Sequence, residues 1–211
     1  MPDDAVIGYL HPGTVRAEFC ASLLAVCMEG KTRIRTVAAL ESGPNISTGR
    51  NLIVRDFLQD NLAPWLFMCD TDMWFPADTV DRLIAADKPV VGGLCWSLDG
   101  GQRYPTMYEL TERDTGVLAF TRYKDWPEDT VMRVPATGAA CLLIHRDALL
   151  AVEKHSRDDP AAPWFRESAV GAPLALMGED MTFCLRCAAA GIPVHVHTGV
   201  KAGHMKTQML I

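Results

Sequence analysis

Short apolar runs alternate with amphipathic segments through the first half of the chain. Four of these runs have the length and composition of buried strands, namely AVIGYL, IRTVAAL, APWLFMC and PVVGGLC. Between them, apolar residues recur at helical spacing in 16–29, in a segment capped by Ser47 or Thr48, and in 76–87. Strand–helix alternation of this kind predicts a parallel sheet with helices on both faces.

The second half continues this alternation but adds polar segments. Residues 99–133 are rich in Gly, Thr, Tyr and charge, with short strand-like stretches at PTMYEL and VLAFTRY. The other predicted elements are a strand at GAACLLIH, a helix over 146–155, a helix that starts near Gly178, and a last strand at VHVH. The Pro-rich segment 156–177 is long enough to predict a lid or an acceptor-binding loop. We find no linker or internal repeat, which predicts one α/β domain over residues 1–211.

Composition narrows the functional classes. The chain has 211 residues, of which 49% are hydrophobic, enough for one compact core. Its 20 basic and 26 acidic residues give a net charge of -6, which argues against bulk attraction to nucleic acid or an anionic membrane. Neither a membrane span nor a signal peptide is found in the sequence, so we expect a soluble, cytoplasmic protein.

The cysteines predict reduced, buried thiols. Seven is an odd number, and most of them stand inside apolar runs such as FCASLLAVC. Cys184 and Cys187 have CxxC spacing, but the second pair that a zinc site needs is missing from the sequence. We therefore interpret them as structural.

The segment FMCDTDMWF carries the strongest indication of chemistry. Asp70 and Asp72 follow a buried strand and are separated by one residue, so both carboxylates can point to one side of the strand end. Ligands of open α/β sheets bind beyond the carboxyl ends of the strands. Two carboxylates at that place suit Mg²⁺ or Mn²⁺ carrying phosphate oxygens. The alternative is a turn in which an aspartate caps the next helix.

Two later segments add candidate residues. In GEDMTFCLRCAAAG, Glu179 and Asp180 open a helix whose dipole favours ionised carboxylates, and an ionised carboxylate can accept a proton from an attacking hydroxyl. In VHVHTGVKAGHMK, His195 and His197 alternate on a strand, and His204 follows in the loop beyond. An imidazole there can complete a metal site made by two aspartates, and a solvated loop histidine is the alternative.

The order of these pieces resembles that of the GT-A glycosyltransferases. A strand followed by Asp-X-Asp, then Gly-Glu-Asp opening a helix, then a histidine past the next strand is similar to small family-2-like enzymes encoded by phages. STGRNLIVRDFLQDNLAPWLFMCDTDM is especially similar, and the resemblance runs from about Val6 to His204. It implies a GT-A nucleotide-diphospho-sugar transferase fold, with a Rossmann-like mixed sheet flanked by helices. Residues 1–97 would bind the nucleotide sugar and residues 98–211 the acceptor.

The resemblance also implies roles for the catalytic and metal residues. Asp72 and His204 would ligate Mn²⁺ or Mg²⁺, and Asp70 would contact the ribose or the metal. Asp180 would be the general base if the enzyme inverts the anomeric carbon, with Glu179 helping to bind the acceptor. If the enzyme retains the configuration, Asp180 would only hold the acceptor.

Further residues would contact the donor, a UDP-sugar by default. By resemblance these are His11, Pro12, Gly13, Thr14, Glu41, Arg50, Asn51 and Asp70. Glu41 would face the base, and Arg50 would reach the diphosphate or the sugar. The loop after the first strand reads HPGT, where many family members have Pro-X-Tyr or Pro-X-Asn.

Other functions and several acceptors remain open. A sugar nucleotidyltransferase would need a Gly-rich, Arg-containing loop after the first strand, and GYLHPGTVR has no such cluster. A binding module without catalytic activity is the other alternative. The acceptor is a modified pyrimidine in phage DNA, a glycan or a virion protein; a phage enzyme would act in the host cytoplasm. DNA would use basic residues and stacking aromatics, for which the candidates are Lys31, Arg33, Arg35, Lys201, Lys206, Trp96, Tyr104 and Tyr108.

Overall fold

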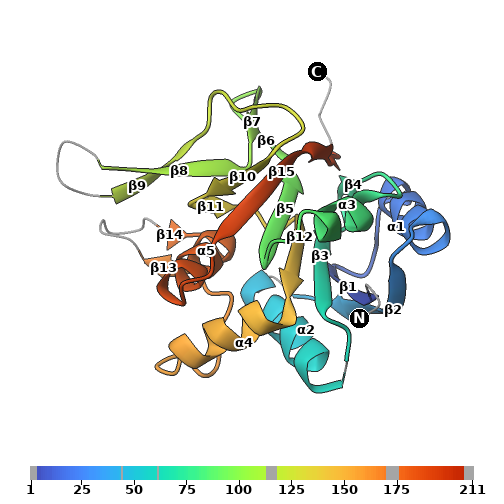
Figure 1. Cartoon of the computed structure of the whole chain (residues 1–211), viewed down its shortest axis with the longest axis horizontal. Coiled ribbons are helices and arrows are strands. Elements are labelled where there is room, and N and C mark those ends of the chain that lie inside the picture. The colour runs from blue at the N-terminus through green and yellow to red at the C-terminus, as the bar shows by residue number, and fades with distance from the viewer. Residues whose placement is uncertain (1–3, 44, 61, 113–117, 170–175, 207–211) are drawn as a thin grey trace.

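The computed structural model describes residues 4–43, 45–60, 62–112, 118–169 and 176–206. A mixed sheet of seven strands lies at the centre, in the order β10-β15-β5-β12-β3-β1-β2 (Figure 1). Its strands are β1 (Asp4–His11), β2 (Arg33–Glu41), β3 (Trp65–Asp70), β5 (Val90–Leu94), β10 (Val131–Val134), β12 (Cys141–His145) and β15 (Val194–Lys201). The α/β class and the mixed sheet predicted from the sequence are confirmed.

Strand direction places several loops at one edge of this sheet. Strands β1, β2 and β3 are parallel, as are β5 and β15. Strand β12 runs antiparallel to both β3 and β5, and β10 runs antiparallel to β15. The carboxyl ends of β1, β2, β3, β5 and β15 therefore share an edge, where ligands of open α/β sheets bind.

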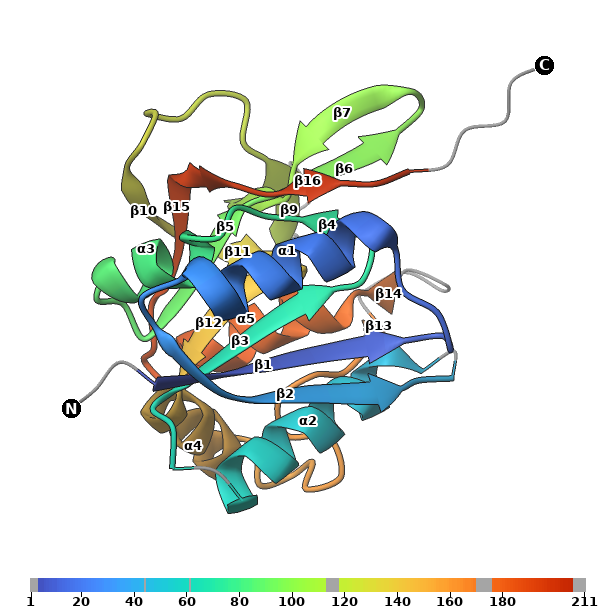
Figure 2. The same cartoon turned by 90° about the vertical axis from the view of Figure 1, so that its right-hand side faces the viewer.

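Helices cover both faces of the sheet (Figures 1 and 2). In the described residues they are α1 (Ala17–Glu29), α2 (Ile46–Asp60), α3 (Thr79–Ala85), α4 (Arg146–His155) and α5 (Glu179–Ala189). Helices α2, α4 and α5 pack on one face through buried residues such as Phe57, Leu149 and Phe183. Helices α1 and α3 pack on the other face through Phe19 and Leu83. Both faces of the central strands β3, β5 and β12 are thus buried, which explains why these strands are almost wholly apolar.

Short strands outside the main sheet shape the loops at its edge. They are β4 (Met73–Trp74), β6 (Trp96–Asp99), β7 (Gln102–Pro105), β8 (Met107–Glu112), β9 (Leu118–Arg122), β11 (Ala136–Thr137), β13 (Ser168–Ala169), β14 (Leu176–Met177) and β16 (Gly203–His204). Strand β4 pairs with β16, β6 with β7, and β13 with β14, while β8 pairs with both β9 and β11. In the described part of the chain, no helix is long and apolar enough to cross a membrane.

Some boundaries differ from the sequence-based predictions. Helix α2 starts at Ile46, and Asn45 caps it by accepting a hydrogen bond from the Thr48 N–H at 3.0 Å, so the cap lies outside Ser47 and Thr48. Helix α3 is shorter than predicted because 76–78 form a turn before it. The predicted lid segment 156–177 is described only in part, as residues 170–175 lie outside the described ranges.

Candidate functional site

The carboxyl ends of three parallel strands bring the N-terminal candidate residues to one edge of the sheet. His11 lies beside Glu41 in the β1–β2 register, and Leu10 lies beside Asp70 in the β1–β3 register. A cavity of about 600 Å³ opens here, lined by Leu10, Pro12, Glu41, Ser42, Gly43, Ile46, Asp70, Thr71 and Asp72. The charged residues of this lining are all acidic. A cation bound at this edge would reduce the repulsion between these carboxylates and an anionic ligand.

The loop after β1 folds back over Glu41. Gly13 has a φ of 92°, which favours glycine, and its N–H donates to His11 Nδ1 at 3.1 Å. A Cβ atom at Gly13 would stand 3.7 Å from Glu41 Oε1. Pro12 reaches the cavity lining, while Thr14 is exposed. The structure thus brings Pro12 to the cavity together with Glu41, and contact of residues 11–14 with a nucleotide stays a prediction.

The β4–β16 ribbon brings His204 to Asp72 across 132 positions of sequence. His204 pairs with Met73 in this antiparallel ribbon, and the Met205 N–H donates to the Asp72 carbonyl oxygen at 2.8 Å. As a result, His204 Nε2 lies 2.8 Å from Asp72 Oδ2. Lys206 Nζ lies 3.1 Å from the same oxygen. One carboxylate oxygen is therefore shared by an imidazole and an ammonium group.

The tautomer of His204 follows from its second partner. His204 Nδ1 lies 2.7 Å from the Trp96 carbonyl oxygen, which only accepts, so Nδ1 carries a proton and donates. Nε2 then faces Asp72 with either a second proton or a lone pair. The hydrogen bond to Asp72 raises the pKa of His204, favouring the second proton. Burial by itself would raise the pKa of Asp72, but His204 and Lys206 outweigh it and lower that pKa to about 2.

The same geometry fits a divalent cation. A cation that replaces the Nε2 proton would meet an imidazole lone pair and a carboxylate, both of which are common ligands of Mn²⁺. Ions of this class often take only one or two protein ligands and complete their shell with phosphate oxygens and water. In the described ranges, no group of three or more His, Cys, Asp or Glu side chains is arranged to hold a metal. The predicted trio is thus split, because Asp70 is engaged elsewhere.

Arg50 is the residue that engages Asp70. From helix α2, its Nη2 donates to Asp70 Oδ1 at 2.8 Å and its Nη1 donates to Glu179 Oε1. The whole residue is 5% exposed, and its guanidinium lies 5.8 Å from the ring centre of Phe165. Burial by itself would lower the pKa of Arg50, but the charges of Asp70 and Glu179 raise it. The guanidinium therefore stays protonated, and its two ion pairs connect the end of β3 to the start of α5.

Asp180 is the candidate base, and its environment suits that task. Gly178 precedes helix α5 and leaves room for it, since a Cβ atom there would stand 2.8 Å from Asp180 Oδ1. The Met181 N–H donates to that oxygen at 2.8 Å. Burial and the neighbouring Glu179 raise the pKa of Asp180 from its ordinary 3.8 to about 6, against the effect of the Met181 N–H and Arg50. The helix N-terminus does not hold this carboxyl at its ordinary pKa, because burial opposes the dipole.

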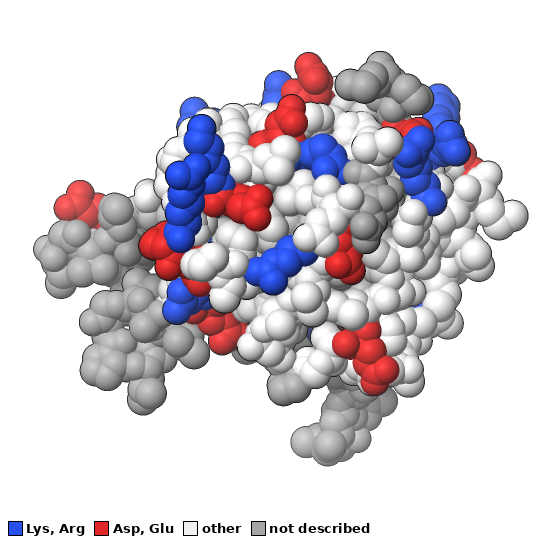
Figure 3. Space-filling model, turned by 90° about the horizontal axis from the view of Figure 1, so that it is seen from below, with Lys and Arg blue, Asp and Glu red and all other residues white. Residues whose placement is uncertain are grey.

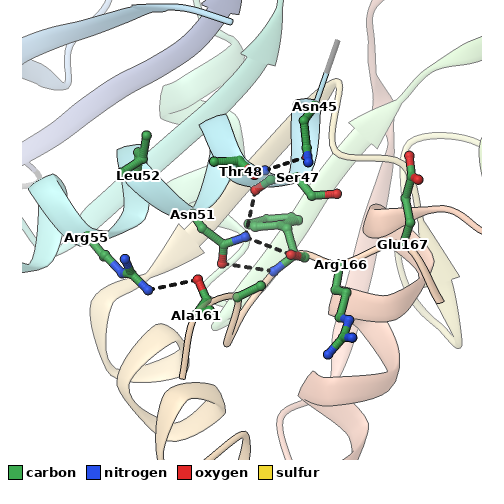
Figure 4. Close-up of a pocket in the computed structure, with 11 residues that line it drawn as sticks. Asn45, Ser47, Thr48, Asn51, Leu52, Arg55, Ala161, Arg166 and Glu167 are labelled. Atoms are coloured by element: carbon green, nitrogen blue, oxygen red, sulfur yellow. Dashed lines mark hydrogen bonds between the residues drawn. The ribbon is translucent and has the colours of Figure 1, made fainter. Parts of the chain in front are cut away.

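The side-chain amide of Asn51 is hydrogen-bonded to the protein backbone. Its Nδ2 donates to the carbonyl oxygens of Ser47 and Phe165 at 2.6 and 2.7 Å, and its Oδ1 accepts from the N–H groups of Trp164 and Phe165 (Figure 4). Arg55, one turn further on, donates to the carbonyl oxygens at 160 and 161. These hydrogen bonds hold residues 160–165 against α2. A second cavity of about 240 Å³ lies between the two segments.

Replacing Asn51 by Ala is expected to lower the free energy of unfolding by roughly 2–4 kcal/mol, because buried backbone groups lose their partners. Chemical denaturation at one pH measures the difference. Gln59→Ala on the exposed side of the same helix is the matched control and is expected to stay within about 0.5 kcal/mol of the wild type. Equal effects of the two substitutions would contradict the assigned role of the Asn51 amide.

Sequence reasoning does not single out Lys206 and Trp96 as parts of this site. It names Lys206 only among the basic residues that a DNA acceptor would use. This residue stands two positions after His204, a spacing that places alternate residues of an extended segment on one side. Trp96 contributes through its backbone carbonyl, for which the sequence carries no signal. His195 and His197 lie within β15, where they pair with Val91 and Gly93 of β5, so they belong to the central sheet and not to the loop that carries His204.

The mixed seven-stranded sheet flanked by helices has the GT-A glycosyltransferase fold. No protein-family model matches the chain, and no curated protein matches its sequence. Among solved structures it is similar to A197 from STIV, with a TM-score of 0.60 and 17% identity over 96% of this chain and 86% of A197.

It is also similar to GalNAc-T7, whose crystal structure is with UDP, GalNAc and Mn²⁺. The TM-score is 0.63 at 9% identity, covering 97% of this chain and 43% of GalNAc-T7. The chain therefore spans less than half the length of that enzyme. Identities this low show a shared fold and leave substrate and mechanism to be argued from the site.

Proposed function

We propose that this chain is a metal-dependent glycosyltransferase, which moves a sugar from a nucleotide-diphosphate sugar to a hydroxyl acceptor. The observation that carries the proposal is the contact between Asp72 and His204 beside a cavity whose charged lining is acidic. A cation in such a cavity would offset the repulsion between its carboxylates and a diphosphate, and Asp72 and His204 offer one carboxylate and one imidazole to hold it. The presence of UDP and Mn²⁺ in the GalNAc-T7 structure supports this choice of ligands.

The residues divide the work as follows. When bound, Mn²⁺ or Mg²⁺ neutralises the charge that develops on the departing diphosphate. Asp72 and His204 hold it, and the Trp96 carbonyl keeps the His204 Nε2 turned toward Asp72. Glu41 and the 11–13 loop face the nucleoside end of the cavity. If the reaction inverts the anomeric carbon, Asp180 accepts the acceptor proton, for which a pKa of about 6 is suitable at neutral pH.

The acceptor is a hydroxyl compound for which DNA, a glycan and a virion protein are candidates. Figure 3 shows one face of the molecule, on which basic and acidic side chains are interspersed rather than gathered by sign. A glycan or protein acceptor is consistent with the net charge of -6. A DNA acceptor would make phosphate contacts, so its binding would weaken steeply with added salt.

The direct test is a panel of sugar nucleotides, each with Mn²⁺, scored by thermal unfolding. A donor at about 100 times its Kd is expected to stabilise the fold by ~2.7 kcal/mol, or roughly 5–10 °C for a chain of this size. The same donor without metal is expected to give little shift. Sugar release from that donor identifies a transferase, and pyrophosphate release with a sugar phosphate would identify a nucleotidyltransferase instead. Stabilisation without any turnover would point to a binding module.

A further inference from the structure

Arg50 occupies a position that contact with a sugar nucleotide does not explain. Its side chain is 6% exposed, and each terminal nitrogen already has a carboxylate partner, Asp70 on one side and Glu179 on the other. These two acids belong to different parts of the site. Asp70 ends β3 and lines the cavity of about 600 Å³, whereas Glu179 starts α5 next to Asp180. Arg50 thus bridges the donor side and the acceptor side from a third element.

A buried guanidinium suits this bridge for physical reasons. Its planar fork presents separate N–H groups in fixed directions, so one cation can hold two carboxylates at once. The Glu179 side chain is 15% exposed, and a carboxylate so far removed from water needs a counter-ion. An arginine that was free to bind a ligand would leave Glu179 unpaired whenever it turned away.

Arg50 also affects the electrostatics of Asp180. The groups around that carboxyl are Glu179 and Cys184 on α5, Arg50 on α2, Asp70 on β3 and Tyr108 on β8. Glu179 and Asp70 raise the pKa of Asp180, and Arg50 lowers it. Removing Arg50 would leave the carboxylates of Glu179 and Asp70 near Asp180 without this cation, so the pKa of Asp180 would rise further.

We propose that Arg50 is a positioning residue, which holds Asp70 and Glu179 in place and acts on sugar transfer through them rather than by touching the donor. The proposal rests on the glycosyltransferase function proposed above. It differs from the role implied by the family resemblance, in which Arg50 reaches the diphosphate or the sugar.

The kinetic test compares Arg50→Met and Arg50→Lys with Arg55→Met, a control that removes a cation from the same helix without touching either acid. Arg50→Met is expected to lower kcat by about tenfold or more while the donor KM changes less than about threefold. Arg50→Lys, which keeps the charge but not the fork, is expected to recover part of kcat. The acid limb of the pH profile is expected to move to higher pH in Arg50→Met. A large rise in donor KM with kcat and the pH profile unchanged would overturn the proposal.

A stability cycle tests the bridge independently of turnover. Arg50→Met alone is expected to destabilise the fold, and adding Glu179→Gln is expected to restore part of the loss because the stranded carboxylate is gone. If Arg50→Met does not fold, the double variant is expected to fold again, and Arg50→Lys carries the kinetic comparison. Strictly additive effects, or a double variant no more stable than Arg50→Met, would overturn the bridge.

The failure of the bridge and the failure of the proposed function can be told apart. If the wild type turns over none of the sugar nucleotides while the stability cycle shows coupling, the proposed function fails and the bridge stands.

Discussion

Asp180→Asn is expected to lower kcat about 10²–10⁴-fold, with donor binding nearly unchanged. The variant keeps the shape of the side chain and removes only its ability to accept a proton, and general-base catalysis commonly contributes a factor of this size. Steady-state kinetics with the donor identified by thermal unfolding would measure it. In the wild type, kcat/KM is expected to fall as the pH drops below about 6, the pKa that burial and Glu179 impose on Asp180. The acid limb should disappear from the residual activity of the variant.

The same substitution is expected to stabilise the fold. The raised pKa means that the folded protein binds a proton more tightly than the unfolded chain, so ionising Asp180 costs stability. The cost is absent below pH 4, develops between about 4 and 6, and reaches roughly 3 kcal/mol above that range. At pH 7.5, Asp180→Asn should therefore unfold at higher denaturant concentration than the wild type, and at pH 4 the two should be similar. Normal kcat in the variant would rule out Asp180 as the base, and Asp180 would then only hold the acceptor.

Asp72→Ala is expected to abolish the stabilisation by donor plus Mn²⁺, a loss of ~2.7 kcal/mol at a donor concentration of about 100 times Kd. The reason is that the metal loses its carboxylate ligand, and the bound metal no longer offsets the repulsion between the diphosphate and Glu41 and Asp70. Transfer activity should be lost with it. His204→Gln is expected to weaken the Mn²⁺-dependent shift, because an amide is a poorer ligand than the imidazole fixed by the Trp96 carbonyl.

Lys206→Met separates a metal site from a simple ion pair. Lys206 contacts the same Asp72 oxygen as His204 and competes with a cation for it. Removing the ammonium group should therefore preserve or increase the Mn²⁺-dependent shift, whereas Asp72→Ala eliminates it. A donor-dependent shift that is equal with and without Mn²⁺ in the wild type, and survives in Asp72→Ala, would show that these side chains form only a structural ion pair.

Local sequence patterns were enough to predict much of the fold. Alternating apolar runs and helical spacings located the main strands and most helices, because burial on both faces of the sheet leaves that pattern in the sequence. Helix ends were less well predicted. The cap of α2 is Asn45, one of several nearby polar residues that are equally plausible caps until the backbone geometry is known.

The placement of Asp70, Asp72 and Asp180 follows from the sequence alone, since Asp70 ends a strand, Asp72 lies in the turn that follows it and Asp180 lies in the first turn of a helix, and these features are encoded locally. Only the tertiary structure pairs His204 with Asp72, because the register of β4 with β16 depends on residues 132 positions apart. Only it brings the Arg50 side chain to Asp70 and Glu179, because helix α2 must first pack against β1 and β2. The raised pKa of Asp180 likewise needs the packed protein, since burial is a property of the fold and not of a residue type.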